Sequence, residues 1–368
     1  MWITSFRFIR SLKLKRRSRS CGTACFSARR AFPIELKNKA GRDPLFDNIK
    51  GILILLVVLG HALEYLRLSD VPTKFIYIWI YEFHMPVFIF ISGFFSKNLE
   101  KGRNTALRTF AIPFIFFNII LTILAILTGK VESFQFFRPG WTLWYLYCMF
   151  LWRLLLPDLV KIRNVFKISL LVGVLYGFSS EFGAYMSMAR LLRFLPYFLG
   201  GYFVKEAYLL KMRSAKWKYV KAALIIAASL LIAAFWIHEN LKPEFFWGDR
   251  SYRLLSMELF YELAFGMLSY FIGFGFVFVL MVLAPAKRHF LTVWGERTLT
   301  IYLLHVYLIG PLVQATQRIP NAGIHFTILA VASVAIVQLL SRSFIVRWLR
   351  IALDRLDRLI MRDPRKKF

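Results

Sequence analysis

Long apolar runs recur along most of the chain and restrict its fold more than any other sequence feature. A helix needs about 17–25 mostly apolar residues to cross the hydrocarbon core of a bilayer. We predict ten membrane-crossing helices, of which the fifth and sixth are short and the eighth is long. They are centred on residues 49–66, 75–95, 109–128, 141–156, 168–180, 190–204, 219–237, 255–283, 298–314 and 325–341. The sequence therefore predicts an all-α, polytopic membrane helix bundle.

The composition supports a membrane protein and argues against three soluble classes. Of the 368 residues, 58% are hydrophobic and 19% are charged, whereas soluble domains average about 45–50% apolar and about 25% charged residues. Lys and Arg nevertheless number 49, against 20 Asp and Glu. An apolar bulk with excess cations indicates a membrane protein whose cations lie outside the bilayer core. We therefore exclude a cytosolic enzyme, a nucleic-acid-binding domain and, with three cysteines, a secreted disulfide scaffold.

Lys and Arg concentrate in alternate loops. Residues 1–43 carry twelve of them against two acidic residues, and residues 342–368 carry nine against three. The four loops between spans on the same predicted side have a net charge of +11, and the five opposite loops have +2. Cytoplasmic loops are enriched in Lys and Arg. We therefore predict a basic cytoplasmic arm over 1–43, a membrane domain over 44–341 and a basic cytoplasmic tail over 342–368, in a multi-pass protein of the inner cell membrane.

Ionisable side chains inside the predicted spans are candidate functional groups, because each costs about 2.5–3.5 kcal/mol on insertion scales. His61 and Glu64 are i,i+3 neighbours near the outer end of the first span, so the carboxylate can orient the imidazole. His84 lies at a similar depth in the second span. Lys50 precedes His61 by eleven residues, about 16 Å of helix, and lies at the cytoplasmic end. Glu82 is two residues from His84 and does not share its helix face.

A second polar group is predicted in the outer half of the sixth and eighth spans. Arg190 and Arg193 are i,i+3 neighbours, and Glu258 and Glu262 are i,i+4 neighbours, so each pair shares one helix face. Ion pairing between these two faces and binding of a polar substrate are both open. For His305 in the ninth span, a packing role and a functional role are equally weighted.

Several kinds of site have no signature in this sequence. We find no P-loop, no dinucleotide fingerprint, no HExxH or GxSxG motif and no zinc-ligand spacing. We therefore predict no metal and no tightly bound cofactor.

Two motifs give the chain a family resemblance. The first is Phe46-Asp47-Asn48-Ile49-Lys50-Gly51-Ile52 with Gly60-His61, and the second is Phe83-His84-Met85-Pro86-Val87-Phe88 with Ser92-Gly93-Phe94. The sequence resembles the acyltransferase-3 family of integral membrane O-acyltransferases, and the second motif resembles its fucose 4-O-acetylase-related branch. Weaker similarities are Trp141–Tyr145, Phe194–Gly200 and Leu299–His305, so the resemblance spreads over residues 44–310.

The resemblance implies an O-acetyltransferase that moves an acetyl or other short acyl group from cytoplasmic acetyl-CoA to a hydroxyl of a cell-envelope or exported glycan. In this view His61 is the general base or a transient acyl carrier, and Glu64 orients it. His84 assists, either by relaying a proton or by holding the thioester oxygen. Lys50 binds the donor from the cytoplasmic side.

The implied substrate contacts extend to further residues. Arg103 and Arg108 are expected to bind the donor, although they stand five apart where many family members have an Arg-x-x-Arg pair. The expected acceptor-binding residues are Glu82, Trp141, Arg190, Arg193, Glu258 and Glu262. Trp141 would stack on a sugar ring or, alternatively, belong to an interfacial aromatic belt. The implied partners are acyl-CoA, a glycan or sugar acceptor and membrane lipids.

The main alternative is a polytopic transporter or flippase for a glycan or lipid, because ionisable residues inside ten spans also suit that class. The pairing of Lys50 with His61 and the motif around His84 favour the acyltransferase. Release of coenzyme A would distinguish the two.

Overall fold

The structure is a computed structural model that describes residues 43–66, 70–129, 142–179, 183, 185–255 and 259–361. Its first half contains α1 (Pro44–Leu63), α2 (Val71–Phe94), α3 (Leu99–Ala106), η1 (Leu107–Ala111), α4 (Ile112–Leu127), α5 (Trp144–Leu159), α6 (Val165–Leu175), η2 (Tyr176–Phe178), η3 (Tyr185–Ser187), α7 (Met188–Phe203) and α8 (Glu206–Arg213). Its second half contains α9 (Lys218–His238), η4 (Pro243–Trp247), α10 (Tyr252–Leu255), α11 (Leu259–Leu283), α12 (Phe290–Glu296), α13 (Thr298–Leu304), α14 (Val306–Thr316), α15 (Ala322–Leu340) and α16 (Ser343–Ile360).

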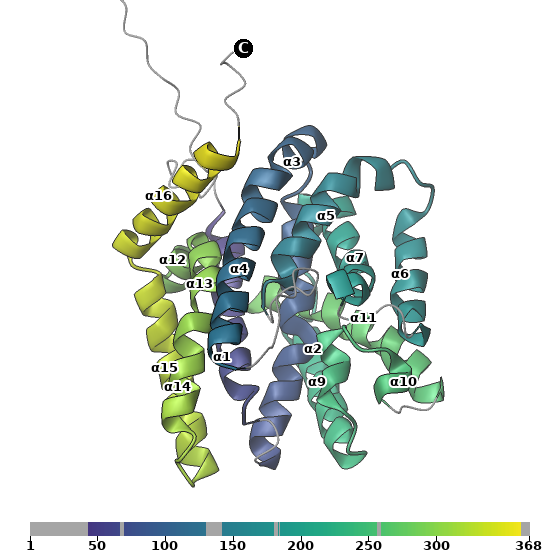
Figure 1. Cartoon of the computed structure of the whole chain (residues 1–368). Helices are drawn as coiled ribbons and strands as arrows, with labels where there is room; N and C mark the ends of the chain where they lie inside the picture. The colour runs from purple at the N-terminus through teal and green to yellow at the C-terminus, as the bar shows by residue number, and fades with distance from the viewer. Residues whose placement is uncertain are drawn as a thin grey trace, which may run out of the picture. The chain divides into compact units, whose positions relative to one another are not determined.

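The described residues form helices and connecting loops with no strand, which confirms the predicted all-α membrane fold (Figure 1). Seven helical segments are long and apolar enough to cross a membrane: Pro44–Leu63, Val71–Phe94, Leu99–Leu127, Lys218–His238, Phe260–Leu283, Thr298–Thr316 and Ala322–Leu340. The other three predicted spans correspond to α5, α7 and the shorter apolar segment Val165–Phe178. The total of ten crossings remains a prediction.

The first two spans begin earlier than the apolar pattern predicts, because side-chain caps set where these helices start. The Asp43 carboxylate accepts a hydrogen bond from the Leu45 amide at 2.9 Å, and the Asp70 carboxylate accepts one from the Thr73 amide at 2.9 Å. An N-cap satisfies a backbone donor that the first helical turn cannot. The polar residue Asn48 therefore lies inside α1, where its side chain donates to the carbonyls of Pro285 and Lys287 at 2.8 Å each.

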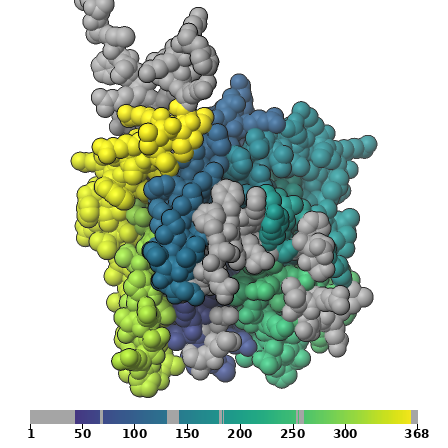
Figure 2. All heavy atoms as spheres, viewed as in Figure 1, coloured from purple at the N-terminus to yellow at the C-terminus, as the bar shows by residue number. Residues whose placement is uncertain are grey.

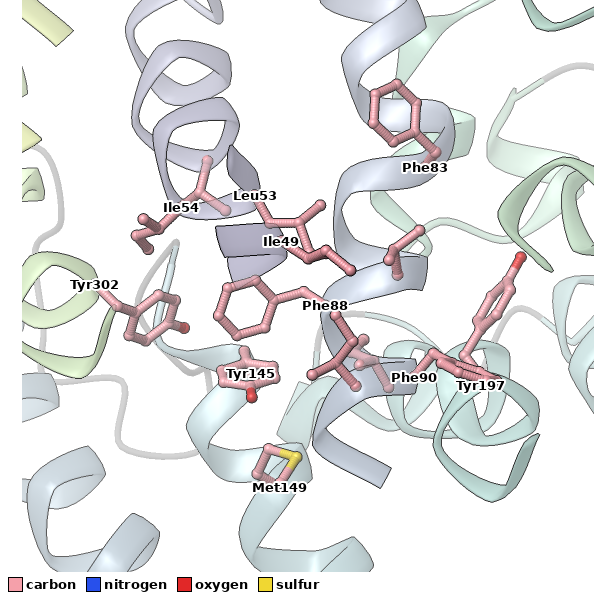
Figure 3. Packing of buried hydrophobic residues seen from close by; sticks show 14 of the residues in the cluster. Ile49, Leu53, Ile54, Phe83, Phe88, Phe90, Tyr145, Met149, Tyr197 and Tyr302 are labelled. Atoms are coloured by element: carbon pink, nitrogen blue, oxygen red, sulfur yellow. The ribbon is translucent and has the colours of Figure 1, made fainter. Parts of the chain in front are cut away.

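α1 and α2 lie against several other helices, and close backbone approaches hold them there. A Cβ atom added to Gly93 of α2 would collide with the Phe198 carbonyl of α7, and one added to Gly51 of α1 would collide with the Leu291 carbonyl of α12. Small residues allow such approaches between membrane helices. Aromatic side chains fill the space around these contacts, as Figure 3 shows for Phe88 and Tyr145, whose ring centroids lie 5.5 Å apart.

The predicted basic loops meet at one end of the bundle. The Lys97 ammonium, just after α2, donates to the Tyr202 carbonyl in the last turn of α7 at 3.1 Å. Arg213 of α8 donates to the Met281 carbonyl of α11 at 2.6 Å, and Arg103 of α3 pairs with Asp158 of α5 at 2.7 Å. We call this end of the bundle the cationic end. Its assignment to the cytoplasm remains a prediction.

The segment predicted as a basic tail is mainly helical. α16 covers Ser343–Ile360, and Val346, Leu349 and Leu353 are buried along one of its faces. In Figure 2 its atoms spread over the surface at the cationic end, beside those of α4. The abundance of arginines hid an apolar i, i+3, i+7 pattern, which is the pattern of a helix that buries one face.

Candidate functional site

A cavity of about 160 Å³ lies among α1, α2, α5, α7, α13 and the segment that contains η4, away from the cationic end. Its wall combines three kinds of group, namely imidazoles, charged side chains and large aromatic rings. The lining residues are Val57, His61, Glu64, Tyr81, His84, Met85, Thr142, Trp144, Arg190, Phe194, Phe246, Trp247, Asp249 and Tyr302. The structure therefore brings together His61, Glu64, His84 and Arg190 of the predicted site residues.

His61 faces a carboxylate and a phenol through the same ring nitrogen. Its Nδ1 lies 3.7 Å from Oε2 of Glu64 and 3.4 Å from the hydroxyl of Tyr81. The Tyr81 hydroxyl also lies 3.4 Å from the same Glu64 oxygen, to which it donates. These contacts agree with the predicted i,i+3 pair and add Tyr81, which sequence spacing did not single out. A carboxylate placed in this way can orient the ring and stabilise its charged form.

His84 has a fixed tautomer. Its Nδ1 lies 2.8 Å from the Ile80 carbonyl oxygen, and because that oxygen can only accept, Nδ1 must carry the hydrogen. In the neutral ring Nε2 is therefore an acceptor. The neutral imidazole can receive a proton or a hydrogen bond, but it cannot donate one to a thioester oxygen.

A third imidazole lies beside His61. The rings of His61 and His305 are stacked with centroids 5.4 Å apart and planes 29° from parallel. Nδ1 of His305 lies 2.8 Å from the Tyr302 carbonyl and 3.1 Å from that of Ile301, so it also carries a hydrogen. Nε2 is buried and has no hydrogen-bond partner among the described residues. His305 stands where α13 ends and α14 begins, an interruption that membrane helices tolerate inside a protein.

A buried ion pair forms the opposite wall of the cavity. Nη2 of Arg190 lies 2.8 Å from Oδ2 of Asp249, and Nε donates to the Trp247 carbonyl at 3.0 Å. The guanidinium also lies over the ring of Trp144, 5.2 Å from its centroid. Charged groups beside aromatic faces suit a polar ligand with apolar ring faces, and Arg190 is held rigidly for such a contact.

Thr142 also lies in the wall of the cavity. The Tyr302 hydroxyl donates to the Thr142 backbone carbonyl and so holds this residue against α13. The Thr142 side-chain hydroxyl is buried and has no hydrogen-bond partner among the described residues.

The predicted donor-binding residues lie at the cationic end. Nζ of Lys50 pairs with Oδ1 of Asp47 at 2.6 Å. Arg108 of η1 lies 3.4 Å from Asp357 of α16. The ammonium of Lys161 and the guanidinium of Arg103 hydrogen-bond to Asp158, and these bonds lower the pKa of its carboxyl. The three residues predicted to bind the acyl donor therefore lie at the end of the bundle opposite the imidazoles.

Other predicted residues lie away from the cavity. Glu82 accepts a hydrogen bond from the Ser229 hydroxyl of α9, so it faces a different helix from His84, as the i,i+2 spacing predicts. Arg193 donates to the Tyr176 hydroxyl at 3.1 Å and lies 4.3 Å from the ring centroid of Phe245.

Ion pairing between the arginine face and the glutamate face, which the sequence leaves open, is not found among the residues that the structure describes. Arg190 pairs with Asp249, and Glu262 is buried without an ion pair to either arginine. Asp249 lies in a loop between short elements, where the helical periodicity used to group the arginines and the glutamates carries no information. Glu258 and Trp141 lie outside the described residues.

Several cavity residues were missed from the sequence because no spacing marks them. Tyr81 and Tyr302 resemble the many other aromatic residues of the spans. Thr142 and Asp249 belong to connecting segments, and Trp247 ends the short helix η4. Among the described residues, no group of three or more His, Cys, Asp or Glu side chains is placed to hold a metal ion.

Comparison with known proteins gives one broad match and two local ones. The family profile described as an acyltransferase domain matches residues 44–342. Nodulation protein NolL of Mesorhizobium japonicum is 37% identical over 84 residues, which are 20% of this chain and 22% of NolL. Nodulation protein NolL of Sinorhizobium fredii is 42% identical over 71 residues, which are 18% of each chain. These matches span about a fifth of the NolL proteins. No solved structure matches the chain.

Proposed function

The chain belongs to the acyltransferase family, and from this premise we propose that it transfers an acetyl or other short acyl group from cytoplasmic acyl-CoA to a hydroxyl of a cell-envelope or exported glycan. As a multi-pass membrane acyltransferase it has an acyl donor and an acceptor. Acetyl-CoA as donor, a glycan as acceptor, the inner cell membrane as location and the fucose 4-O-acetylase-related branch are parts of the proposal. The family match favours this function over a transporter or flippase.

The observation that carries the proposal is that His61, with Glu64 at its Nδ1, shares one cavity with the acceptor nitrogen of His84. A sugar hydroxyl is a weak nucleophile at neutral pH and needs a base to remove its proton. Imidazole is suited to this role because it exchanges protons near neutral pH. Packing alone does not account for two imidazoles and a carboxylate around one cavity inside a membrane domain.

In the proposed step, the acceptor hydroxyl oxygen attacks the carbonyl carbon of the acyl thioester. His61 takes the hydroxyl proton, the new carbon–oxygen bond forms and the carbon–sulfur bond breaks. The imidazolium then returns the proton to the thiolate, so the products are an ester and coenzyme A. Glu64 and Tyr81 support the charged His61 ring, and His84 accepts or relays a proton through Nε2. As the alternative, His61 carries the acyl group covalently before the hydroxyl takes it.

The donor is proposed to bind at the cationic end, where Lys50, Arg103 and Arg108 attract its phosphates. About 16 Å of helix separates Lys50 from His61, and the pantetheine arm of the donor would cover that distance. On the acceptor side, Arg190 and Asp249 offer a hydrogen-bond donor and an acceptor, and Trp144 offers a ring face. This combination suits a polyhydroxylated ring.

The test uses membranes that contain the full chain, with radiolabelled acetyl-CoA as the donor. Wild type is compared with His61→Ala and with His238→Ala, a control at the exposed end of α9. We expect wild type and His238→Ala to release coenzyme A and to label envelope glycan. His61→Ala should be slower by about 10²–10⁴-fold. Equal labelling by His61→Ala would reject the role of His61, and no release of coenzyme A by wild type would reject the acyl-CoA donor.

A further inference from the structure

An apolar groove of about 500 Å³ lies between the end of α13, α14, α15 and α16, apart from the imidazole cavity. Leu304, Tyr307 and Leu308 form one wall, and the last turn of α15 forms the floor. Phe344, Ile345 and Trp348 of α16 form the other wall. Most of α16 lies beyond the stretch 44–342 that matches the family profile, so the match does not account for this helix.

α16 has an apolar face that is not covered by the bundle. Its buried face is formed by Val346, Leu349 and Leu353. Phe344 and Trp348 are 67% and 64% exposed and are i,i+4 neighbours on another face. A helix that buries one apolar side in its protein and presents aromatic residues on another is suited to lie along a membrane interface.

The charges of α16 complement an anionic lipid headgroup. Residues 342–361 carry five arginines and two aspartates, and one of the aspartates, Asp357, already pairs with Arg108. Arg347 and Arg355 are exposed and flank Trp348 along the helix. Each cation near an anionic membrane surface contributes about 1 kcal/mol of attraction. The groove therefore opens beside a surface that favours a negatively charged headgroup.

We propose that this groove binds one acyl chain of an anionic phospholipid. The acyl chain lies against the apolar walls of the groove, and the arginines of α16 face the phosphate of the lipid. The site is separate from the acyl-transfer cavity and does not rest on the proposed function.

The experiment uses the full purified chain in detergent and native mass spectrometry. The protein is equilibrated with phosphatidylglycerol or with phosphatidylcholine of the same acyl chains. We expect wild type to retain one phosphatidylglycerol in preference to phosphatidylcholine. Leu308→Trp fills the groove and should weaken retention by about tenfold or more, because each excluded methylene removes about 0.8 kcal/mol. The double variant Arg347→Gln with Arg355→Gln leaves the groove unchanged and should reduce the preference for phosphatidylglycerol by about tenfold or more, because each cation contributes about 1 kcal/mol.

The matched control is Leu231→Trp, which adds the same side chain to an exposed position of α9 and should leave retention unchanged. Equal retention of phosphatidylglycerol by wild type and Leu308→Trp would overturn the groove as the site. Equal retention of the two lipids by wild type would overturn the role of the arginines. If Leu308→Trp fails to fold, the double arginine variant decides the outcome, because it changes only exposed side chains.

Discussion

The imidazole of His305 stacks on that of His61 at a centroid distance of 5.4 Å, while its own Nδ1 is held by two carbonyl oxygens of α13. One face of the His61 ring is thus supported by a side chain that cannot turn without losing both hydrogen bonds. The other constraint on His61 comes from Glu64 and Tyr81 at Nδ1. The orientation of His61 therefore depends on elements that are far apart in the sequence.

We expect His305→Ala to slow acyl transfer by about tenfold or more, because removing the stacked ring lets His61 leave the reactive orientation. His305→Phe keeps a ring face and should retain more activity than His305→Ala. The turnover number, measured at saturating donor with wild type alongside, checks both variants. A turnover number for His305→Ala equal to that of wild type would show that the stack does not position His61.

Variants of the Arg190–Asp249 pair can test its contribution to protein stability separately from its role in acceptor binding. Both side chains are about one-tenth exposed, and removing one partner of a buried pair costs about 3–5 kcal/mol. Asp249→Ala should therefore lower the midpoint of thermal unfolding. The double variant Arg190→Met with Asp249→Leu should recover much of that loss, because an apolar pair replaces the ion pair.

The same double variant tests the acceptor site. We expect its Michaelis constant for the acceptor to rise while the constant for the donor stays near that of wild type. Full activity of the stable double variant at low acceptor concentration would exclude this pair from acceptor binding.

Substitutions of Glu82 and His84 should affect the rate of acyl transfer differently, although the two residues are only two positions apart. Glu82→Gln retains a group that can hydrogen-bond Ser229 and lies outside the cavity, so transfer should stay within about threefold of wild type. His84→Phe removes the acceptor nitrogen from the cavity wall and should slow transfer by about 10²-fold or more. Acyl-transfer rates are measured in membranes with equal amounts of each variant. A rate loss in Glu82→Gln as large as that in His84→Phe would show that Glu82 takes part in the reaction.

Gly93 fixes how closely α2 approaches α7. Gly93→Ala places a Cβ atom against the Phe198 carbonyl, so we expect a large loss of folded protein, because two backbones must separate. Gly310→Ala is the matched control, since nothing lies within 4 Å of its added Cβ. Size-exclusion profiles after mild solubilisation measure the folded fraction. Equal profiles for the two variants would contradict this tight contact.

Much of the bundle is predictable from the sequence, because the signal for a membrane helix is local. Apolar length predicts where α1, α2 and α9 lie, and the i,i+3 spacing predicts the contact between His61 and Glu64. The starts of α1 and α2 are less predictable, because they depend on caps at Asp43 and Asp70 rather than on hydropathy. The helical form of α16 was missed because its arginines masked a buried stripe.

The sequence by itself determined the class of fold, the separation of basic and apolar regions and the imidazole pair His61 and His84. These follow from composition and from spacing along single helices. The tertiary structure decided that His305 stacks on His61, that Asp249 pairs with Arg190 and that Glu82 faces α9. Such contacts join segments that are distant along the chain. These contacts depend on how whole helices rotate and approach one another, and no local pattern of residues predicts that geometry.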